Sequence, residues 1–354
     1  MTFGPQHYVP VLKVKRGEKA ALRAISAVVR PWITPLLEVV VRRVDKATLD
    51  DHLDTGFSGL ARSVRPYARC FLDTRELADD DPDAAEKVFR RARTEGMVFT
   101  PVTGISRVAD ITAALDHRTD GIAVRLTREE FEHGGLTRRI SSFLGHHGLT
   151  PEQVDLIVDL GAVDKLIADG IAALTAAFLA EVPHHANWRT LTVSGCAFPA
   201  GLSSVDRNGD ALIERAEWIA WRDGLHARRV SLPRLPTFSD CAIQHPKGVE
   251  GFDPKTMQAS ATVRYAVSGS WLIIKGEGTK KKLASLQFPG LATQLVSGPL
   301  CANFAGARHC EGCGGIKAAA GGAPRLGSLE VWRRLGTIHH VTAVIDGLAA
   351  LPWP

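Results

Sequence analysis

The segment YVPVLKVKRGE (residues 8–18) decides the fold, because a short apolar strand runs directly into a charged segment that begins a helix. The same combination of an apolar run and a following helical pattern recurs along the chain as far as residue 245. Repeated strand–helix units of this kind predict an α/β fold of the TIM-like (β/α)8 barrel type. In such a barrel the carboxyl ends of all the strands surround one shared pocket.

The eight expected strands are short and mostly apolar. The second, ITPLLEVVV, is almost entirely apolar, which is typical of a parallel strand buried on both faces. Helices are expected between the strands, including a long one over residues 213–229. The barrel would occupy residues 1–246, with strands at 8–15, 33–41, 68–73, 97–103, 121–126, 154–160, 189–194 and 237–243.

The pattern changes after residue 246. Residues 261–276, ATVRYAVSGSWLIIKG, predict a β-hairpin whose strands are joined by Ser-Gly-Ser. Because no flexible linker precedes residues 247–354, we expect them to form an α+β elaboration that caps the barrel and is not an independent domain. Its other expected elements are a helix at 281–296, a glycine- and alanine-rich segment at 305–327, a helix at 328–335 and a strand at 338–345.

Composition indicates an ordinary globular protein, with 354 residues, 45% hydrophobic and 23% charged. The net charge of +5 is mild and its only dense run is Lys280–Lys282, so a solvated surface is favoured. Nucleic acid is not excluded as a partner, and an acidic protein partner would suit the charge. We expect a cytoplasmic protein with reduced thiols and no membrane contact, because no signal peptide and no apolar run of about 18–20 residues is visible.

Several familiar catalytic motifs are absent from the chain. There is no P-loop, no GxGxxG after a strand, no GxSxG and no HExxH. These absences weigh against a nucleotide-fuelled motor, a dinucleotide-dependent oxidoreductase, an α/β-hydrolase and a zincin.

Charged side chains stand at or just after the ends of most expected strands. Paired carboxylates can bind a divalent metal ion or share acid–base work, while lysine and arginine can hold a phosphate. Alternatively, the same residues form a buried salt-bridge network that closes the barrel mouth, since buried charges need partners. Charges at so many strand ends favour the functional interpretation. The residues concerned are Lys13, Lys15, Glu18, Glu38, Asp73, Arg125, Asp159 and Asp240.

Two segments have the composition of metal sites. Residues 206–217, DRNGDALIERAE, space their oxygen-bearing side chains like a calcium loop, but Ala211 stands where the turn needs glycine. The alternative is a polar loop followed by a helix that begins near Leu212. In His309-Cys-Glu-Gly-Cys313 the two cysteines, with the histidine and Cys301, could form a zinc site, a redox pair or a set of ordinary thiols.

The paired histidines His339 and His340 fall in the expected final strand. Side chains alternate along a strand, so only one of the two would face the pocket.

Several segments together resemble the bacterial and phage beta protein family. The matching segments are YVPVLKVKRGE (8–18), ITPLLE (33–38), SDCAIQHP (239–246), VRY (263–265) and WRRLGTIHH (332–340). The resemblance implies that barrel and C-terminal part form one module. The family has no settled activity, but its members look like accessory or mobile-element-associated proteins, which suggests a role in phage conflict.

The resemblance also adjusts the candidate sites. Family members carry a tyrosine where this chain has Cys241, and a Ser-x-Gly-Asp segment in place of residues 310–313, so the CxxC is a local departure that weakens the zinc interpretation. The matching segments contain Asp240 and add further candidates, namely His245, Arg264, Tyr265, His339 and His340.

Two functions remain open at this point. The first is a metal-assisted enzyme acting on an anionic substrate, phosphorylated or nucleotide-like; the second is a non-catalytic scaffold of a mobile-element or defence system that binds a ligand or an acidic protein. In the first, a divalent metal ion is the expected cofactor. Catalysis would involve Glu38, Asp73, Asp159, Asp240, His245, His339 and His340. Substrate binding would involve Lys13, Lys15, Glu18, Arg125, Arg264 and Tyr265.

Overall fold

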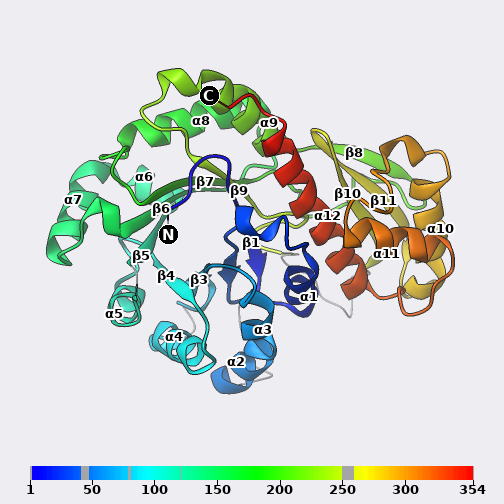
Figure 1. The fold of residues 1–354 in the computed structure, drawn as a ribbon, viewed down its shortest axis with the longest axis horizontal. Coiled ribbons are helices and arrows are strands. Elements are labelled where there is room, and N and C mark those ends of the chain that lie inside the picture. The colour runs from blue at the N-terminus through cyan, green and yellow to red at the C-terminus, as the bar shows by residue number, and fades with distance from the viewer. Residues whose placement is uncertain (1, 41–47, 79–80, 120, 249–258, 354) are drawn as a thin grey trace.

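A closed barrel of eight parallel strands forms the centre of the protein (Figure 1). The computed structural model describes residues 2–40, 48–78, 81–119, 121–248 and 259–353. The strands follow one another in chain order around the ring, and the last pairs with both β7 and β1 to close it. The predicted (β/α)8 barrel is therefore confirmed. Its strands are β1 (Tyr8–Lys13), β2 (Leu36–Glu38), β3 (Cys70–Asp73), β4 (Phe99–Thr103), β5 (Ile122–Leu126), β6 (Val154–Ala162), β7 (Thr190–Cys196) and β9 (Thr237–Asp240). The expected second strand is shorter than predicted, and its last residue, 41, lies outside the described residues.

Helices surround the barrel and cover its outer surface (Figure 1). In α4, for example, Val88 and Phe89 are buried, and the Phe89 ring stacks on Phe99 of β4 at 5.8 Å between centroids. The helices before β9 are α1 (Arg16–Ala24), α2 (Leu49–Phe57), α3 (Leu60–Val64), α4 (Ala84–Thr94), α5 (Val108–Asp116), α6 (Arg128–Glu132), α7 (Leu136–His146), α8 (Ala168–Glu181) and α9 (Ala216–Ile219).

The chain between β7 and β9 contains one strand that is not part of the barrel. Strand β8 (Asp210–Glu214) pairs antiparallel with β11 (Ser270–Gly278), which in turn pairs with β10 (Ser260–Val267). The hairpin predicted from ATVRYAVSGSWLIIKG is present as β10 and β11. Strand β8, which comes from the sequence between two barrel strands, pairs with β11 and makes the hairpin a three-stranded sheet. The helix expected over 213–229 is present but begins only at Ala216, because DALIE before it alternates between half-buried and exposed side chains as an edge strand does.

The segment after β8 is helical but irregular. The short helix α9 continues into a π-helical turn at Ala220–Leu225 and a 3-10 turn at His226–Ser231. The calcium-loop interpretation gains no support, because the acidic side chains of residues 206–217 do not form a metal-ligating group among the described residues. The alternative, a polar loop followed by a helix near Leu212, agrees with the loop and the helix, but strand β8 lies between them and the helix begins at Ala216.

A single helix, α12 (Leu329–Ala349), replaces the short helix and strand expected at the C-terminus. Its buried apolar residues recur at intervals of three and four, as on a helix packed on its neighbours. Ser328 caps the helix by accepting a hydrogen bond from the Val331 amide. The helix packs against α1, and Gly347 lies against the Trp218 ring of α9, so α12 completes the ring of helices (Figure 1). The buried positions include Leu335, Ile338, Val341, Val344 and Leu348.

The C-terminal elaboration has a hydrophobic core of its own. Helices α10 (Ala284–Val296) and α11 (Glu311–Ala320) pack with the first half of α12 on the hairpin, burying Phe288 and Trp332. The second half of α12, including Val344, packs in the barrel core instead. The barrel and the elaboration therefore do not divide at residue 246. Strand β8 precedes this residue but pairs with the hairpin of the elaboration, and α12 follows it but packs in both hydrophobic cores. No helix in the described ranges combines the length and apolar character needed to cross a membrane.

Candidate functional site

Arg125 is the centre of a charged network inside the barrel, at the carboxyl ends of the strands. Its Nη1 lies 2.7 Å from Oε1 of Glu38 and 2.8 Å from Oδ2 of Asp73. Its Nη2 lies 2.8 Å from Oδ2 of Asp159. Closure of the barrel thus brings together three of the four predicted carboxylates, from β2, β3 and β6, around one guanidinium group from β5.

Further cations surround these carboxylates. The Lys13 ammonium lies 2.6 Å from Glu38 and also contacts Glu76. Arg107 lies 2.7 Å from Asp73, and Arg75 lies 2.9 Å from Asp159. Each inner carboxylate therefore accepts from at least two cations.

The cations keep the three inner carboxyl groups ionised. Burial alone would raise the pKa values of Glu38, Asp73 and Asp159, but the adjacent guanidinium and ammonium groups outweigh burial and lower them. A metal ion would have to displace these cations before it could bind the carboxylates. The network thus has the form of the buried salt bridges that the sequence offered as an alternative.

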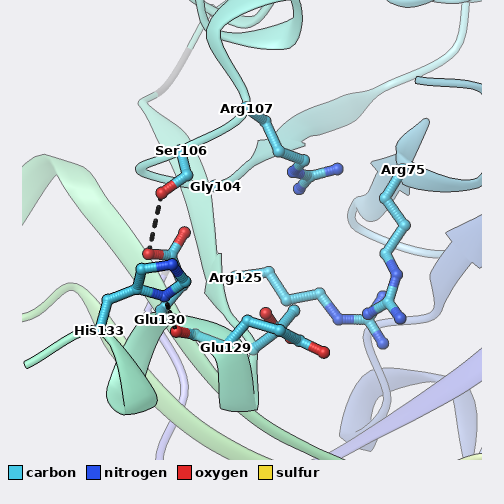
Figure 2. Close-up of a pocket in the computed structure, with 9 residues that line it drawn as sticks. Arg75, Gly104, Ser106, Arg107, Arg125, Glu129, Glu130 and His133 are labelled. Atoms are coloured by element: carbon cyan, nitrogen blue, oxygen red, sulfur yellow. Dashed lines mark hydrogen bonds between the residues drawn. The ribbon is translucent and has the colours of Figure 1, made fainter. Parts of the chain in front are cut away.

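A pocket of about 370 Å³ opens beside this network, over the loops that follow β4 and β5 (Figure 2). Figure 2 shows Arg75, Arg107 and Arg125 along one side of it, and Ser106 and His133 on the other. The pocket lies at the carboxyl face of the barrel, where TIM-barrel enzymes place their active sites. Its remaining lining residues are Gly104, Thr127, Glu129 and Glu130.

Arginine side chains give one side of the pocket its positive charge. Arg75, Arg107 and Arg125 all line the pocket. Nη2 of Arg107 has no hydrogen-bond partner among the residues that the structure describes, but this atom is buried, so a ligand would reach it only after the side chain moves.

The opposite side of the pocket carries carboxylates and an imidazole. Ser106 donates a hydrogen bond of 3.0 Å to Glu130, whose other partner is Arg139. Nδ1 of His133 lies against the backbone carbonyl of Glu129, which leaves the ring oriented by helix α6. Hydrogen bonds from Thr127 and from a backbone amide lower the pKa of Glu129, so this side is anionic. The pocket is therefore cationic on one side and anionic on the other.

Asp240, the fourth predicted carboxylate, belongs to a different cluster. The hydroxyl of Tyr8 donates to Asp240, Nε2 of His340 lies 2.9 Å from it, and Arg215 lies 3.4 Å away. Tyr8 and Asp240 lie on the outer face of the barrel wall, because the side chains of Lys13 and Glu38 occupy the inner face. The expectation that Asp240 joins the other carboxylates is wrong.

This outer cluster fixes one histidine tautomer and leaves one carboxyl group unsatisfied. Nε1 of Trp271 donates to Nδ1 of His340 at 3.4 Å, so Nε2 carries the proton that points to Asp240. Neither side-chain oxygen of Glu217 has a hydrogen-bond partner among the described residues. Burial raises the pKa of Glu217 to about 8, opposed by Arg215 and reinforced by Asp240.

The sequence model of the family described as Beta protein matches residues 8–346, from the start of β1 to near the end of α12. The chain belongs to the Beta protein family. No curated protein and no solved structure matches it. Family membership covers barrel and elaboration together, as the resemblance implied.

The remaining predicted site residues of this Beta protein family member lie away from the pocket. Tyr265 and His339 pack against the cysteines of α11, whereas His340, on the next position of α12, contacts Asp240. Successive residues on a helix point about 100° apart, so the two histidines serve different clusters. Arg264 donates to the Ile243 carbonyl at 2.6 Å. The Glu18 carboxylate accepts hydrogen bonds from Gln244 and Arg333. Lys15 is exposed, just before the start of α1. His245 is buried, and its Nδ1 lies 3.3 Å from the Lys247 amide nitrogen.

Arg264 lines a second, larger cavity of about 1020 Å³ between the barrel and the elaboration. Phe198 and Ile243, which follow β7 and β9, form part of its apolar wall. Arg264 and Arg125 therefore do not hold one ligand together. The cationic lining residues are Arg207, Arg264, Lys275, Lys280 and Arg333.

Two of the three arginines that line the pocket, Arg75 and Arg107, were not among the predicted site residues. Arg75 follows the last residue of β3 by two positions, and Arg107 follows β4 by four. The first loop residues after a strand also face the mouth of a barrel. Arginine in those loop positions was the available signal.

Proposed function

We propose that this member of the Beta protein family is a barrel enzyme that binds a small anionic substrate, phosphorylated or nucleotide-like, in the pocket of Figure 2. The observation that carries the proposal is the gathering of three guanidinium groups, those of Arg75, Arg107 and Arg125, along one side of this pocket. Guanidinium groups suit phosphate because their N–H donors match pairs of its oxygens.

The two-sided charge of the pocket narrows the substrate class. An anionic group would bind the arginines, while hydroxyl or amino groups would donate to Glu129 and Glu130 on the other side. A phosphorylated sugar or a nucleotide carries both kinds of group. In this proposal Glu38, Asp73 and Asp159 position the arginines and do not bind a metal ion.

Ligand binding should depend on Arg107. In a melting-shift titration with pyrophosphate and nucleoside monophosphates, the wild type should gain about 3 kcal/mol of stability at a hundredfold excess over the dissociation constant. Arg107→Ala should lose most of this gain, because it removes one of the three guanidinium groups that line the pocket. Arg207→Ala, in the second cavity, is the matched control and should keep the gain. Equal losses in both variants, or none in Arg107→Ala, would exclude this pocket as the binding site.

His133 is the group best placed to transfer a proton in the pocket. His133→Gln should reduce turnover of a bound phosphorylated compound by about 100-fold or more and leave its dissociation constant nearly unchanged. The measurement compares product formation and binding in the two proteins.

A non-catalytic binding protein is the second candidate function. It is favoured by the pairing of every inner carboxylate of the network with a cation, which leaves these groups fully occupied. Saturable binding without turnover in the wild type would select this alternative. A role in phage conflict, an acidic protein partner and a cytoplasmic location belong to the same proposal, and the cationic second cavity is where an acidic partner would fit.

A further inference from the structure

We propose that Cys310, Cys313 and His339, with His309 as the fourth ligand, bind a zinc ion in the C-terminal elaboration. The two sulfur atoms lie 3.6 Å apart. Nδ1 of His339 lies 3.3 Å from Sγ of Cys313 and 4.0 Å from Sγ of Cys310. A ligand atom of His309 lies within 4.8 Å of those of Cys310 and His339.

These separations are those of a tetrahedral site. Zinc–sulfur bonds of about 2.3 Å and zinc–nitrogen bonds of about 2.0–2.1 Å place two sulfurs about 3.8 Å apart and a sulfur and a nitrogen about 3.6 Å apart. The three separations among Cys310, Cys313 and His339 all fall within about 0.4 Å of these values. A disulfide needs a sulfur separation of about 2.05 Å, so the two cysteines are free thiols in this structure.

The hydrogen bonds of His339 prepare it as a ligand. Its Nε2 lies 2.7 Å from the carbonyl oxygen of Ala266, which can only accept, so Nε2 carries the proton. Nδ1 is then the unprotonated nitrogen, and it is the atom directed at both sulfurs. Metal-bound histidines usually donate their second ring N–H to a carbonyl or carboxylate in this way.

Tyr265 supports the same cluster from β10. Its ring stacks on that of His339, with centroids 3.7 Å apart and planes 10° from parallel. Its hydroxyl accepts a hydrogen bond of 3.0 Å from the Ala305 amide, so it is placed to donate its own proton to Cys313 Sγ at 3.3 Å. Such a donor stabilises a thiolate, the form of cysteine that binds zinc.

The local sequence brings the cysteines to the histidine. Cys310 caps α11 and accepts from the Cys313 amide, so both sulfurs lie at the start of the helix. Gly312, between them, is required for the approach of α11 to α12: a Cβ there would lie 2.4 Å from the Leu335 carbonyl oxygen. The spacing Cys-Glu-Gly-Cys thus gives both the ligand pair and the close helix contact.

His309 is the nearest further ligand: its ligand atom groups with those of Cys310 and His339 within 4.8 Å, but that group does not include Cys313, so His309 would turn toward the ion on binding. Its Nε2 is buried and has no hydrogen-bond partner within the described part of the chain; the nearest carboxylate oxygen, on Asp346, is 3.6 Å away. Two thiolates and two imidazoles select zinc among the abundant divalent ions and form a closed, structural site. The ion would join the start of α11 to the middle of α12 and so hold the elaboration together.

The test is metal content and spectroscopy of the full-length protein purified under reducing conditions. We expect about one zinc ion per chain by elemental analysis. Replacing zinc with cobalt(II) should give the visible absorption of a tetrahedral thiolate site. Cys310→Ser should lose the ion and the cobalt spectrum, and the wild type should melt at a lower temperature after chelation.

Two further variants keep the test decisive. Cys301→Ser alters an exposed cysteine outside the cluster and should retain the ion. Tyr265→Phe should fold and bind zinc about 10-fold more weakly, because it removes only the hydroxyl. A metal-free protein that also fails to bind added zinc, a Cys310–Cys313 disulfide in its place, or retention of zinc by Cys310→Ser would each overturn the proposal.

Discussion

Replacing Arg125 with leucine is expected to destabilise the protein by about 3–5 kcal/mol or more at pH 7. The substitution leaves Glu38, Asp73 and Asp159 buried at the barrel mouth without their shared partner. Each carboxylate keeps one other cation, but all three lose the guanidinium group that they share, and removing one partner of a buried ion pair is strongly destabilising. Urea unfolding followed by circular dichroism measures the loss.

The pH dependence of this loss gives a second check. In the wild type the lowered pKa values of the three carboxyl groups contribute stability at neutral pH that disappears as the pH falls through their folded values. In Arg125→Leu burial is no longer opposed by the central cation, so the carboxyl groups protonate more readily. The difference between the two proteins should therefore shrink from pH 7 to pH 5.

Two control substitutions frame the Arg125 result. Arg125→Lys keeps the charge without the three-way geometry and should lose less stability than Arg125→Leu. Arg90→Leu removes an exposed partner of Glu86 and should change stability by less than about 1 kcal/mol. A deficit in Arg125→Leu no larger than that of Arg90→Leu, or one that grows in acid, would show that the network does not stabilise the fold.

Glu217→Gln is expected to stabilise the protein, with an effect that appears only as the pH rises. The folded protein holds the Glu217 proton up to a pKa of about 8, whereas the unfolded chain releases it near 4.5. The wild type therefore loses stability between these values and no further above them. Glutamine resembles the protonated form and has no proton to lose, so the variant escapes this loss.

The expected gain follows from the size of the shift. At about 1.4 kcal/mol per pKa unit, Glu217→Gln should exceed the wild type by on the order of 3–4 kcal/mol at pH 8 and by less than about 1 kcal/mol at pH 5. Glu214→Gln makes the same change of charge at an exposed position of β8 and serves as the control. A gain that is equal at both pH values would mean that Glu217 is ionised in the folded protein.

The barrel was predictable because each strand–helix unit carries its own local pattern. The meeting of Glu38, Asp73 and Asp159 followed from the same reasoning, since the ends of parallel strands converge. For Asp240 the strand end was predicted correctly, but the face of the barrel wall on which its side chain lies was not. A shift of one residue moves every side chain of a strand to the opposite face, and the sequence of β9 does not say which face Asp240 takes.

The elements that were predicted wrongly owe their structure to contacts with residues far away in the sequence. DALIE becomes a strand because β11, about 60 residues later, offers an edge to pair with. The segment with His339 and His340 becomes a helix because it is packed between the hairpin and the barrel, where both sides are buried. For the same reason the sequence offered His309 and Cys301 as partners of the CxxC cysteines, whereas the structure places His339, 26 residues after Cys313 and on another helix, against them.

The position of α12 has a consequence for biosynthesis. The helix that fills the gap between α9 and α1 is made after the barrel strands and the hairpin, and β8 can pair only once β11 has been made. During translation, the emerging barrel would therefore expose apolar surface on β1 and an unpaired strand until residues 329–349 have left the ribosome. Chains truncated before residue 329 should for that reason associate with chaperones or aggregate and not accumulate as smaller barrels.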